Sequence, residues 1–161
     1  MVQEWQITNR LKHRNIVATK ESFFGDGQLI MILEFCEYGD LNTQIEEKKD
    51  GLSVWTDVEL YSVLLQITKG LEFAHANDVM HLDLKPGNIF VKEDNVLKIG
   101  DFGICKVVQV GRVKRKEVKD EKVARQGTVH YCSPGALKGH RESPSDDIWA
   151  LGCILHELAT R

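Results

Sequence analysis

The 161-residue chain lacks several features that mark specialised classes of protein. Its four cysteines, Cys36, Cys105, Cys132 and Cys153, form no CxxC pair, which argues against a disulfide framework or a zinc site. The first residues contain neither the basic nor the apolar segment of a secretory signal. The longest apolar run, residues 148–155, is too short to span a bilayer. These absences predict free thiols and a cytoplasmic location.

The charge balance gives no sign of a polyanionic partner. The net charge is −3, so the sequence predicts no binding to nucleic acid or to an anionic membrane surface. Hydrophobic residues make up 42% of the chain and charged residues 28%, which is typical of a globular protein with a buried core. No linker, low-complexity segment or internal repeat divides the sequence, so we expect one domain.

Two short polar motifs are the most informative part of the sequence. The first, HLDLKPGN at residues 81–88, contains a potential proton acceptor in Asp83 and a cation in Lys85. Its Asn88 and the Asp101 of the following Asp-Phe-Gly motif carry oxygen atoms of the kind that Mg²⁺ prefers. Phosphoryl transfer needs these groups, because it depends mainly on positioning and charge stabilisation. The alternative is an ordinary polar loop between two strands. In that case the residues of both motifs would have to occur together by chance, which is expected at about one in 10⁹ positions.

The first third of the chain predicts a mixture of helices and strands. Apolar residues at helical intervals predict a helix over residues 2–12. Two strands are expected at 16–24 and 28–35, joined by a glycine-rich hairpin turn. The second strand is apolar without alternation, which predicts burial on both of its faces. A bend then leads into a short helix over residues 40–48.

A long helix follows in the middle of the chain. Thr56 and Glu59 have the spacing of a capping box, which predicts a helix that begins there and ends near Ala76. Its apolar stripe is expected at Leu60, Leu64, Ile67, Leu71 and Ala74. Beyond it we expect a short strand at 79–80, a hairpin of strands 89–91 and 96–99, and a final helix over 147–160 capped by Ser145 or Asp146.

Residues 104–127 form a basic segment without helical or strand periodicity. It contains eight basic and three acidic residues and no Ser, Thr or Tyr, so this interval offers no hydroxyl for phosphorylation. Two interpretations stay open, a solvated charged loop and a docking surface for an acidic substrate or partner. The basic residues are Lys106, Arg112, Lys114, Arg115, Lys116, Lys119, Lys122 and Arg125.

Taken together, these motifs resemble a protein kinase, and most closely the NIMA-related (Nek) group of serine/threonine kinases. The resemblance implies an α+β, protein kinase-like fold. Residues 1–35 would be a truncated small lobe, with helix C and two strands, and residues 36–161 the hinge and a mainly helical, incomplete large lobe ending at the central helix F. The residues that carry the resemblance are 11–17, 33–41, 81–90, 98–104, 127–134 and 147–153.

The resemblance implies a nucleotide site and its supporting glutamate. Glu4 matches the helix-C glutamate that pairs with a lysine on the third strand of the family. The backbone of residues 34–36 matches the hinge that hydrogen-bonds adenine. The residues implied to surround ATP are the gatekeeper Leu33, the hinge residues Glu34 and Cys36, then Asp40, and Phe90 as the floor of the adenine pocket.

The resemblance also implies the catalytic roles. Asp83 would accept the proton of the substrate hydroxyl, and Lys85 would face the γ-phosphate. Asn88 and Asp101 would hold Mg²⁺. Structural and regulatory roles are implied for His81, Phe102, Gly103, the Thr128 that lies beside the catalytic aspartate, and the Asp147 that braces the catalytic-loop backbone.

The chain departs from the family pattern at several positions. Its 161 residues contain neither the G-x-G-x-x-G loop nor the V-A-I-K lysine strand that hold the ATP phosphates in kinases. Leu82 stands where the family has arginine, and Gly135 stands where it has glutamate. Thr8 and Thr19 occupy positions that large apolar residues usually fill.

Two classes of function follow. The four retained residues Asp83, Lys85, Asn88 and Asp101 favour an enzyme, a serine/threonine kinase that uses ATP, Mg²⁺ and a protein substrate. The missing elements and the substitutions favour a catalytically inactive pseudokinase or truncated fragment that acts as a protein-binding module. Family analogy adds a nuclear, centrosomal or ciliary location as an alternative to the cytoplasm.

Overall fold

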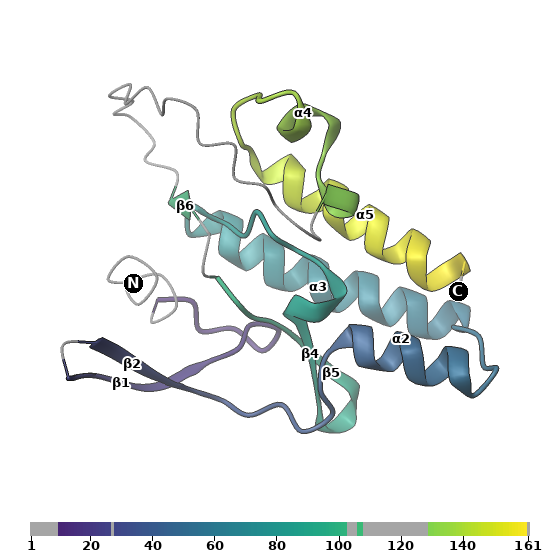
Figure 1. Cartoon of the computed structure of the whole chain (residues 1–161), viewed down its shortest axis with the longest axis horizontal. Helices are drawn as coiled ribbons and strands as arrows, with labels where there is room; N and C mark the ends of the chain where they lie inside the picture. Colours follow the sequence, from purple (N-terminus) through teal and green to yellow (C-terminus); the bar gives the residue numbers. More distant parts are fainter. Residues whose placement is uncertain (1–9, 27, 103–105, 108–128, 161) are drawn as a thin grey trace.

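The structure, a computed structural model, describes residues 10–26, 28–102, 106–107 and 129–160. Helices and short antiparallel strand pairs both occur in these ranges, which confirms the α+β class. Figure 1 shows a long hairpin on one side of a larger part that is mainly helical. Within the described ranges, no helix is both long enough and apolar enough to cross a membrane.

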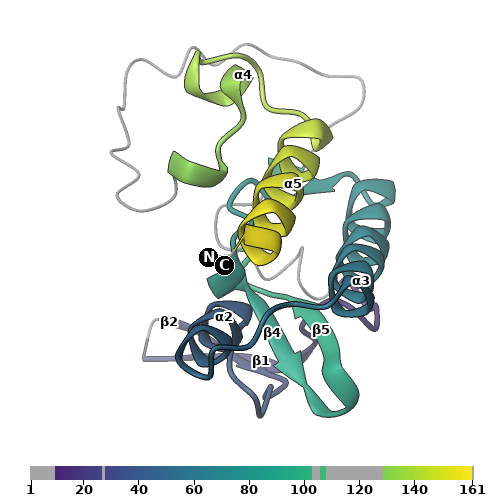
Figure 2. The same cartoon turned by 90° about the vertical axis from the view of Figure 1, so that its right-hand side faces the viewer.

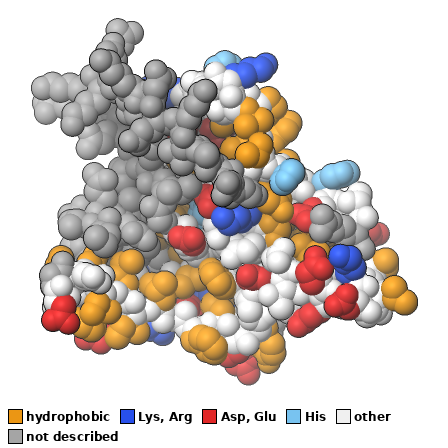
Figure 3. Space-filling view, viewed as in Figure 1, with side chains coloured by type: hydrophobic (Ala, Val, Ile, Leu, Met, Phe, Trp, Pro, Cys, Tyr) orange, Lys and Arg blue, Asp and Glu red, His pale blue; other side chains and the backbone are white. Residues whose placement is uncertain are grey.

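The hairpin consists of β1 (Thr19–Gly25) and β2 (Gln28–Leu33), paired antiparallel. The first strand begins later than expected, because Ile16 instead forms an isolated parallel bridge with Ile99. The prediction that β2 is buried on both faces is wrong. Ile30, Ile32 and Leu33 are 41–46% exposed, because β2 pairs only with β1 among the described strands and no described layer covers it. Figure 3 shows apolar side chains gathered over this hairpin.

The segment just before the hairpin attaches it to the helical part. The side-chain nitrogen Nδ2 of Asn15 donates hydrogen bonds to the Leu97 carbonyl (2.8 Å) and to the Gln66 side-chain oxygen (3.1 Å). The Asn15 carbonyl in turn accepts from the Ile99 N–H (2.9 Å). Asn15 is 4% exposed, so these bonds also satisfy polar groups that would otherwise be buried without partners.

Two helices, α2 (Leu41–Asp50) and α3 (Asp57–Ala76), follow the hairpin. Asp40 caps α2 by accepting from the Thr43 N–H (2.8 Å). The expected capping box of α3 is present, since Glu59 accepts from the Thr56 N–H (2.8 Å) and Thr56 accepts from the Glu59 N–H (3.3 Å). Glu59 also pairs with Lys48 (2.9 Å), which joins the two helices.

The buried face of α3 differs in part from the predicted stripe. Leu64 is 39% exposed, so its placement in the core was wrong. Val63 takes its place, because the turn of the helix sets Val63 in line with Ile67 and Ala74 and places Leu64 beside that face. At Gly70 a β-carbon would lie 2.9 Å from the Asn15 carbonyl, so only glycine permits this close approach of α3.

The remaining elements surround the two polar motifs. The expected hairpin at 89–99 and the short strand at 79–80 are confirmed. The elements are β3 (Val79–Met80), η1 (Pro86–Asn88), β4 (Ile89–Lys92), η2 (Glu93–Asn95), β5 (Val96–Ile99), β6 (Lys106–Val107), η3 (Val129–Tyr131), α4 (Pro134–Leu137) and α5 (Pro144–Thr160).

Two predicted helix boundaries need correction. Helix α5 begins at Pro144, so the cap expected at Ser145 or Asp146 was wrong; proline favours the first turn because it has no N–H to leave unpaired. Residues 10–12 are not helical, and the rest of the helix expected over 2–12 lies outside the described residues.

One apolar core joins these elements. Helix α3 packs along α5 and against β5, and Figure 2 shows α5 and α3 next to each other with β4 and β5 below. Burial of each large apolar side chain contributes about 1.5–3 kcal/mol. The large apolar side chains that are less than 2% exposed are Leu11, Ile16, Leu41, Ile45, Ile67, Leu71, Leu84, Ile89, Ile99, Ile154 and Leu158.

The contact between Glu59 and Lys48 gives a prediction about pH. The hydrogen bond from Lys48, and then that from the Thr56 backbone, lower the pKa of Glu59 from 4.5 to about 2. The ionised carboxylate therefore stabilises the fold above about pH 4.5, and this stabilisation is lost as the pH falls toward 2. We expect Glu59→Gln to lower the free energy of unfolding near neutral pH, measured by urea unfolding, with a difference that shrinks below about pH 4.5.

The matched control is Glu21→Gln, on the exposed face of β1, which should change the free energy of unfolding little at any pH. A Glu59→Gln difference that stayed constant into the acid range would contradict the role given to the ionised pair.

Candidate active site

The centre of the site is the buried carboxylate of Asp147, near the start of α5. Its Oδ1 accepts from the Leu82 N–H (2.8 Å), and its Oδ2 accepts from the His81 N–H (2.9 Å). The same Oδ2 accepts from Nε2 of His75, at the end of α3 (2.7 Å). Asp147 is 1% exposed, and three donors satisfy its charge in place of water. One side chain thus connects two helices with the segment that begins at His81.

His81 is fully buried and has a defined role in holding the segment. Its Nε2 donates to the Gly100 carbonyl (2.9 Å), so its Nδ1 is free to accept from the Asp83 N–H (3.2 Å). Burial lowers the pKa of His81 despite the opposing effects of the Gly100 bond and of Asp147, so the ring is neutral. The ring also packs against Phe102, with centroids 4.9 Å apart.

The backbone adopts an unfavourable conformation at the residue after His81 and at the residue after Gly100, which His81 contacts. Leu82 and Asp101 have φ values of 66° and 56°, in the left-handed region that disfavours residues with a β-carbon. Each costs about 1–2 kcal/mol. The two hydrogen bonds to Asp147 hold the first, and the Gly100 carbonyl bonded to His81 precedes the second. Such strain is typical of positions where geometry serves function.

Asp83, Lys85 and Asn88 come together as the sequence predicts. Lys85 Nζ lies 2.9 Å from Asp83 Oδ2. Asn88, which is buried in η1, donates from Nδ2 to the Asp83 carbonyl (2.8 Å) and weakly to its Oδ2 (3.4 Å). Within the described chain nothing bonds Asp83 Oδ1 or Asn88 Oδ1, which leaves both oxygens available.

Asp101 lies next to this group through the backbone. The Gly100 N–H donates to the Asn88 carbonyl (2.9 Å), which fixes the start of the Asp-Phe-Gly motif beside η1. A β-carbon at Gly100 would lie 2.7 Å from the Phe90 ring, so glycine is required there. Phe102 is buried, whereas Asp101 is exposed.

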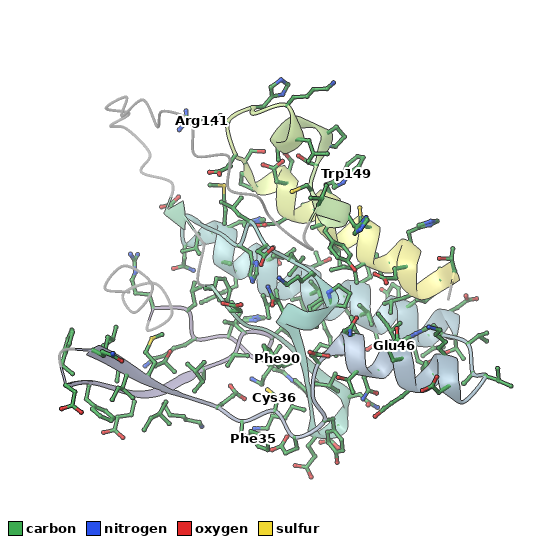
Figure 4. All side chains as sticks on the ribbon, in the orientation of Figure 1. Phe35, Cys36, Glu46, Phe90, Arg141 and Trp149 are labelled. Carbon is green, nitrogen blue, oxygen red and sulfur yellow. The ribbon has the colours of Figure 1, made fainter. Side chains whose placement is uncertain are left out.

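A cavity of about 590 Å³ adjoins Asp101, between the hairpin and β4. Figure 4 shows Phe35, Cys36 and Phe90 grouped beside it. The N–H of Cys36 has no hydrogen-bond partner among the described residues, so it can bind a ligand. Most of the residues that the sequence predicted for the nucleotide line this cavity, namely Leu33, Glu34, Cys36, Asp40, Phe90 and Asp101, whereas Asn88 and Lys85 do not line it.

The side-chain carboxylate of Glu34 forms structural contacts that support one wall of this cavity. It accepts from the Ala18 N–H (2.9 Å) and pairs with Lys98 (3.0 Å), which is 8% exposed and also donates to the Arg14 carbonyl (2.9 Å). Burial raises the pKa of Glu34, but the Ala18 and Lys98 contacts outweigh it and hold the pKa below its ordinary value. Burial likewise raises the pKa of the Cys36 thiol.

Three predicted residues, Glu4, Gly103 and Thr128, lie outside the described residues, as does most of the basic segment. Among the described residues, Cys36 and Cys153 carry free thiols, as expected.

Sequence reasoning missed two functional supports, Lys98 and His75. A signal existed for Lys98, because a single charge in the apolar strand Val-Leu-Lys-Ile needs a partner when buried. The partner itself, Glu34, lies 64 positions away in sequence and could not be inferred. His75 carried no signal, since a polar residue at the end of a helix is ordinary.

The comparisons with known proteins agree with this arrangement. A family model described as protein kinase domain matches residues 1–161. The mouse serine/threonine-protein kinase Nek4 is 37% identical over 159 residues, which cover 98% of this chain and 19% of Nek4. Nek11 of Macaca fascicularis is 36% identical over 155 residues (96% and 23%), and mouse Nek1 is 34% identical over 160 residues (98% and 12%).

The chain therefore belongs to the protein kinase domain family. Within that family it is similar to Nek serine/threonine kinases along nearly its whole length, which confirms the resemblance seen in the motifs. The chain spans between 12% and 23% of the length of these curated relatives.

The Asp147 network gives a prediction about stability. Asp147→Ala leaves the N–H groups of His81 and Leu82 buried without partners, which costs about 1–3 kcal/mol for each group. We expect the free energy of unfolding, measured with urea, to fall by about 3 kcal/mol or more. Asp50→Ala, at the exposed end of α2, is the control and should change it by less than about 0.5 kcal/mol. Equal effects of the two substitutions would refute the network.

Proposed function

We propose that this chain forms the nucleotide cavity and catalytic segment of a Nek-like serine/threonine protein kinase. One observation carries the proposal. The group Asp83, Lys85 and Asn88 is held by partly buried hydrogen bonds next to a cavity that Asp101 and the predicted hinge residues line. In this proposal residues 1–35 belong to the small lobe and 36–161 to the hinge and large lobe, in a protein of the cytoplasm.

The adenine of ATP would bind between the apolar side chains Leu33 and Phe90. The free N–H of Cys36 and the carbonyl of Glu34 face no competing partner among the described residues, which supports adenine recognition by the backbone. The buried pair of Glu34 and Lys98 would keep this wall in place. Asp40 lines the same cavity and would contact the nucleotide.

The donor set fits a magnesium ion. Because Asn88 Nδ2 is committed to Asp83, its Oδ1 is left as a ligand, and the exposed carboxylate of Asp101 provides a second oxygen. Asn88 and Asp101 would hold the ion, which would neutralise charge on the transferring phosphates.

Asp83 would take the hydroxyl proton of a substrate Ser or Thr through its available Oδ1. The hydroxyl oxygen forms a bond to the γ-phosphorus, the bond to the β–γ bridging oxygen breaks, and ADP leaves. Lys85, now paired with Asp83, would face the γ-phosphate when ATP is bound. The neutral His81 would hold the Asp83 backbone and take no part in the proton transfer.

A second function is favoured by specific features of the sequence. Leu82 and Gly135 stand where the family has an arginine and a glutamate. A non-catalytic module that contacts partners is the alternative.

Nucleotide binding is tested by the melting temperature. We expect Mg·ATP at millimolar concentration to raise it, and ATP with a chelator to raise it less. Asp101→Asn should remove the magnesium-dependent part, while Asp94→Asn, at another exposed aspartate with positive φ, should leave it intact. No shift of the wild-type chain at saturating Mg·ATP would contradict nucleotide binding by these residues.

Catalysis is tested by transfer of labelled γ-phosphate to a degenerate serine/threonine peptide library. We expect Asp83→Asn to lower the rate by about 10²-fold or more, because it removes the proton acceptor. Asp78→Asn, at an exposed aspartate with positive φ, should have no effect. Nucleotide binding without any transfer by the wild-type chain would favour the non-catalytic module. An unchanged rate in Asp83→Asn would exclude Asp83 as the base.

A further inference from the structure

A second cavity, of about 480 Å³, lies beside the segment that attaches the hairpin. Its charged lining consists of four cationic side chains, Lys12, Arg14, Lys20 and Lys98, and one carboxylate, Glu34. This excess of positive charge contrasts with the net charge of −3 of the whole chain. The electrostatic potential at the cavity is therefore expected to favour anions.

The single carboxylate does not neutralise this lining. Glu34 pairs with Lys98 (3.0 Å) and lies 3.5 Å from Lys92, so its charge is already shared by two lysines. In the described part of the chain, no carboxylate pairs with Lys12, Arg14 or Lys20, and all three side chains are exposed. Three cations thus line one hollow with no counter-charge of their own.

Two further features of the lining bear on its chemistry. Burial lowers the pKa of His13, which lines the cavity, and the charges of Lys98 and Lys69 lower it further, as expected in a positive field. The hydroxyl of Thr19, also in the lining, is buried and has no hydrogen-bond partner among the described residues. Native proteins seldom leave such a group unsatisfied, and a bound ligand could supply its partner.

We propose that this cavity binds a phosphate group, either as free phosphate or as the monoester of a phosphorylated protein side chain. A phosphate monoester carries a charge of about −1.5 to −2 and three strong acceptor oxygens, which suits three unpaired cations better than a single carboxylate does. The guanidinium of Arg14 can donate two parallel hydrogen bonds to such oxygens, and Lys12 and Lys20 add point charges.

This site is separate from the nucleotide cavity, although Glu34 lines both. Lys12, Arg14, Lys20 and Thr19 do not line the nucleotide cavity. A phosphate probe can therefore be assigned to one cavity by the residues whose signals it changes.

The experiment follows backbone amide resonances of the full chain at constant ionic strength. The probes are inorganic phosphate, a capped Gly–phosphoserine–Gly peptide and its unphosphorylated counterpart. We expect both phosphate probes to shift the amides of residues 18–20 in a saturable manner, and the unphosphorylated peptide to shift none. A phosphopeptide that binds at least about tenfold more tightly than phosphate identifies a phosphorylated protein as the source, and equal affinities identify a small phosphate.

The variant Arg14→Gln/Lys20→Gln should weaken phosphate binding by about tenfold or more, because it removes two charged donors. Both side chains are exposed and unpaired among the described residues, so the fold is retained, which unchanged resonances elsewhere would verify. Lys138→Gln, at an exposed lysine beyond α4, is the control and should bind like the wild type.

Three results would overturn the proposal. They are an absence of saturable shifts at residues 18–20, shifts confined to residues 100–102 in the nucleotide cavity, and equal affinities of the double variant and the wild type. Since none of these readouts requires phosphoryl transfer, a failure here is distinct from a failure of the kinase function.

Discussion

The conformation of residues 81–88, the proposed catalytic segment, depends on hydrogen bonds to the buried carboxylate of Asp147. This carboxylate accepts hydrogen bonds from α3, through His75, and from the backbone of His81 and Leu82. A buried charge is tolerated only when donors satisfy it, and a residue keeps a positive φ only when its surroundings fix it. The backbone N–H groups of the loop satisfy the Asp147 carboxylate, and the carboxylate in turn holds the loop in its conformation. The contact between α3 and α5 and the conformation of the loop are therefore one structural unit, which sets the positions of Asp83 and Asn88.

A second polar connection, the buried pair of Lys98 and Glu34, plays the same part for the nucleotide cavity. Lys98 belongs to β5, in the strand that leads to Asp101, while Glu34 ends the hairpin and begins the proposed hinge. This ion pair thus connects the two segments on either side of the cavity. Asn15 adds further hydrogen bonds between the same parts of the fold, to Leu97 and Gln66. Lys98 and Glu34 both line the second cavity, and Glu34 also lines the proposed nucleotide cavity, so this ion pair lies where the two cavities adjoin.

Local patterns predicted the parts of this structure that depend on neighbouring residues. The capping box of Thr56 and Glu59 and the hairpin of residues 89–99 depend on neighbouring residues, and both were found where expected. The exposure of Ile30 could not be predicted. An apolar strand sequence shows that the strand is able to pack against another layer, but it does not show whether such a layer is present. The site motifs were predictable as a constellation, but the His75 and Lys98 contacts were not, because they join positions far apart in sequence. The roles proposed for the site residues come from the family resemblance, whereas the packing of the structure explains why these residues lie where they do.

The central claim is that Asp147 holds the proposed catalytic segment, residues 81–88, in place before any ligand binds. The most direct measurement is the hydrogen-exchange rate of the His81 and Leu82 amides in the unliganded wild-type chain. If the carboxylate holds them, both should exchange as slowly as amides in the middle of α3, because they would open only with global unfolding. Exchange as fast as at the exposed hairpin turn near Asp26 would contradict the claim, because it would mean that the segment opens independently of the core.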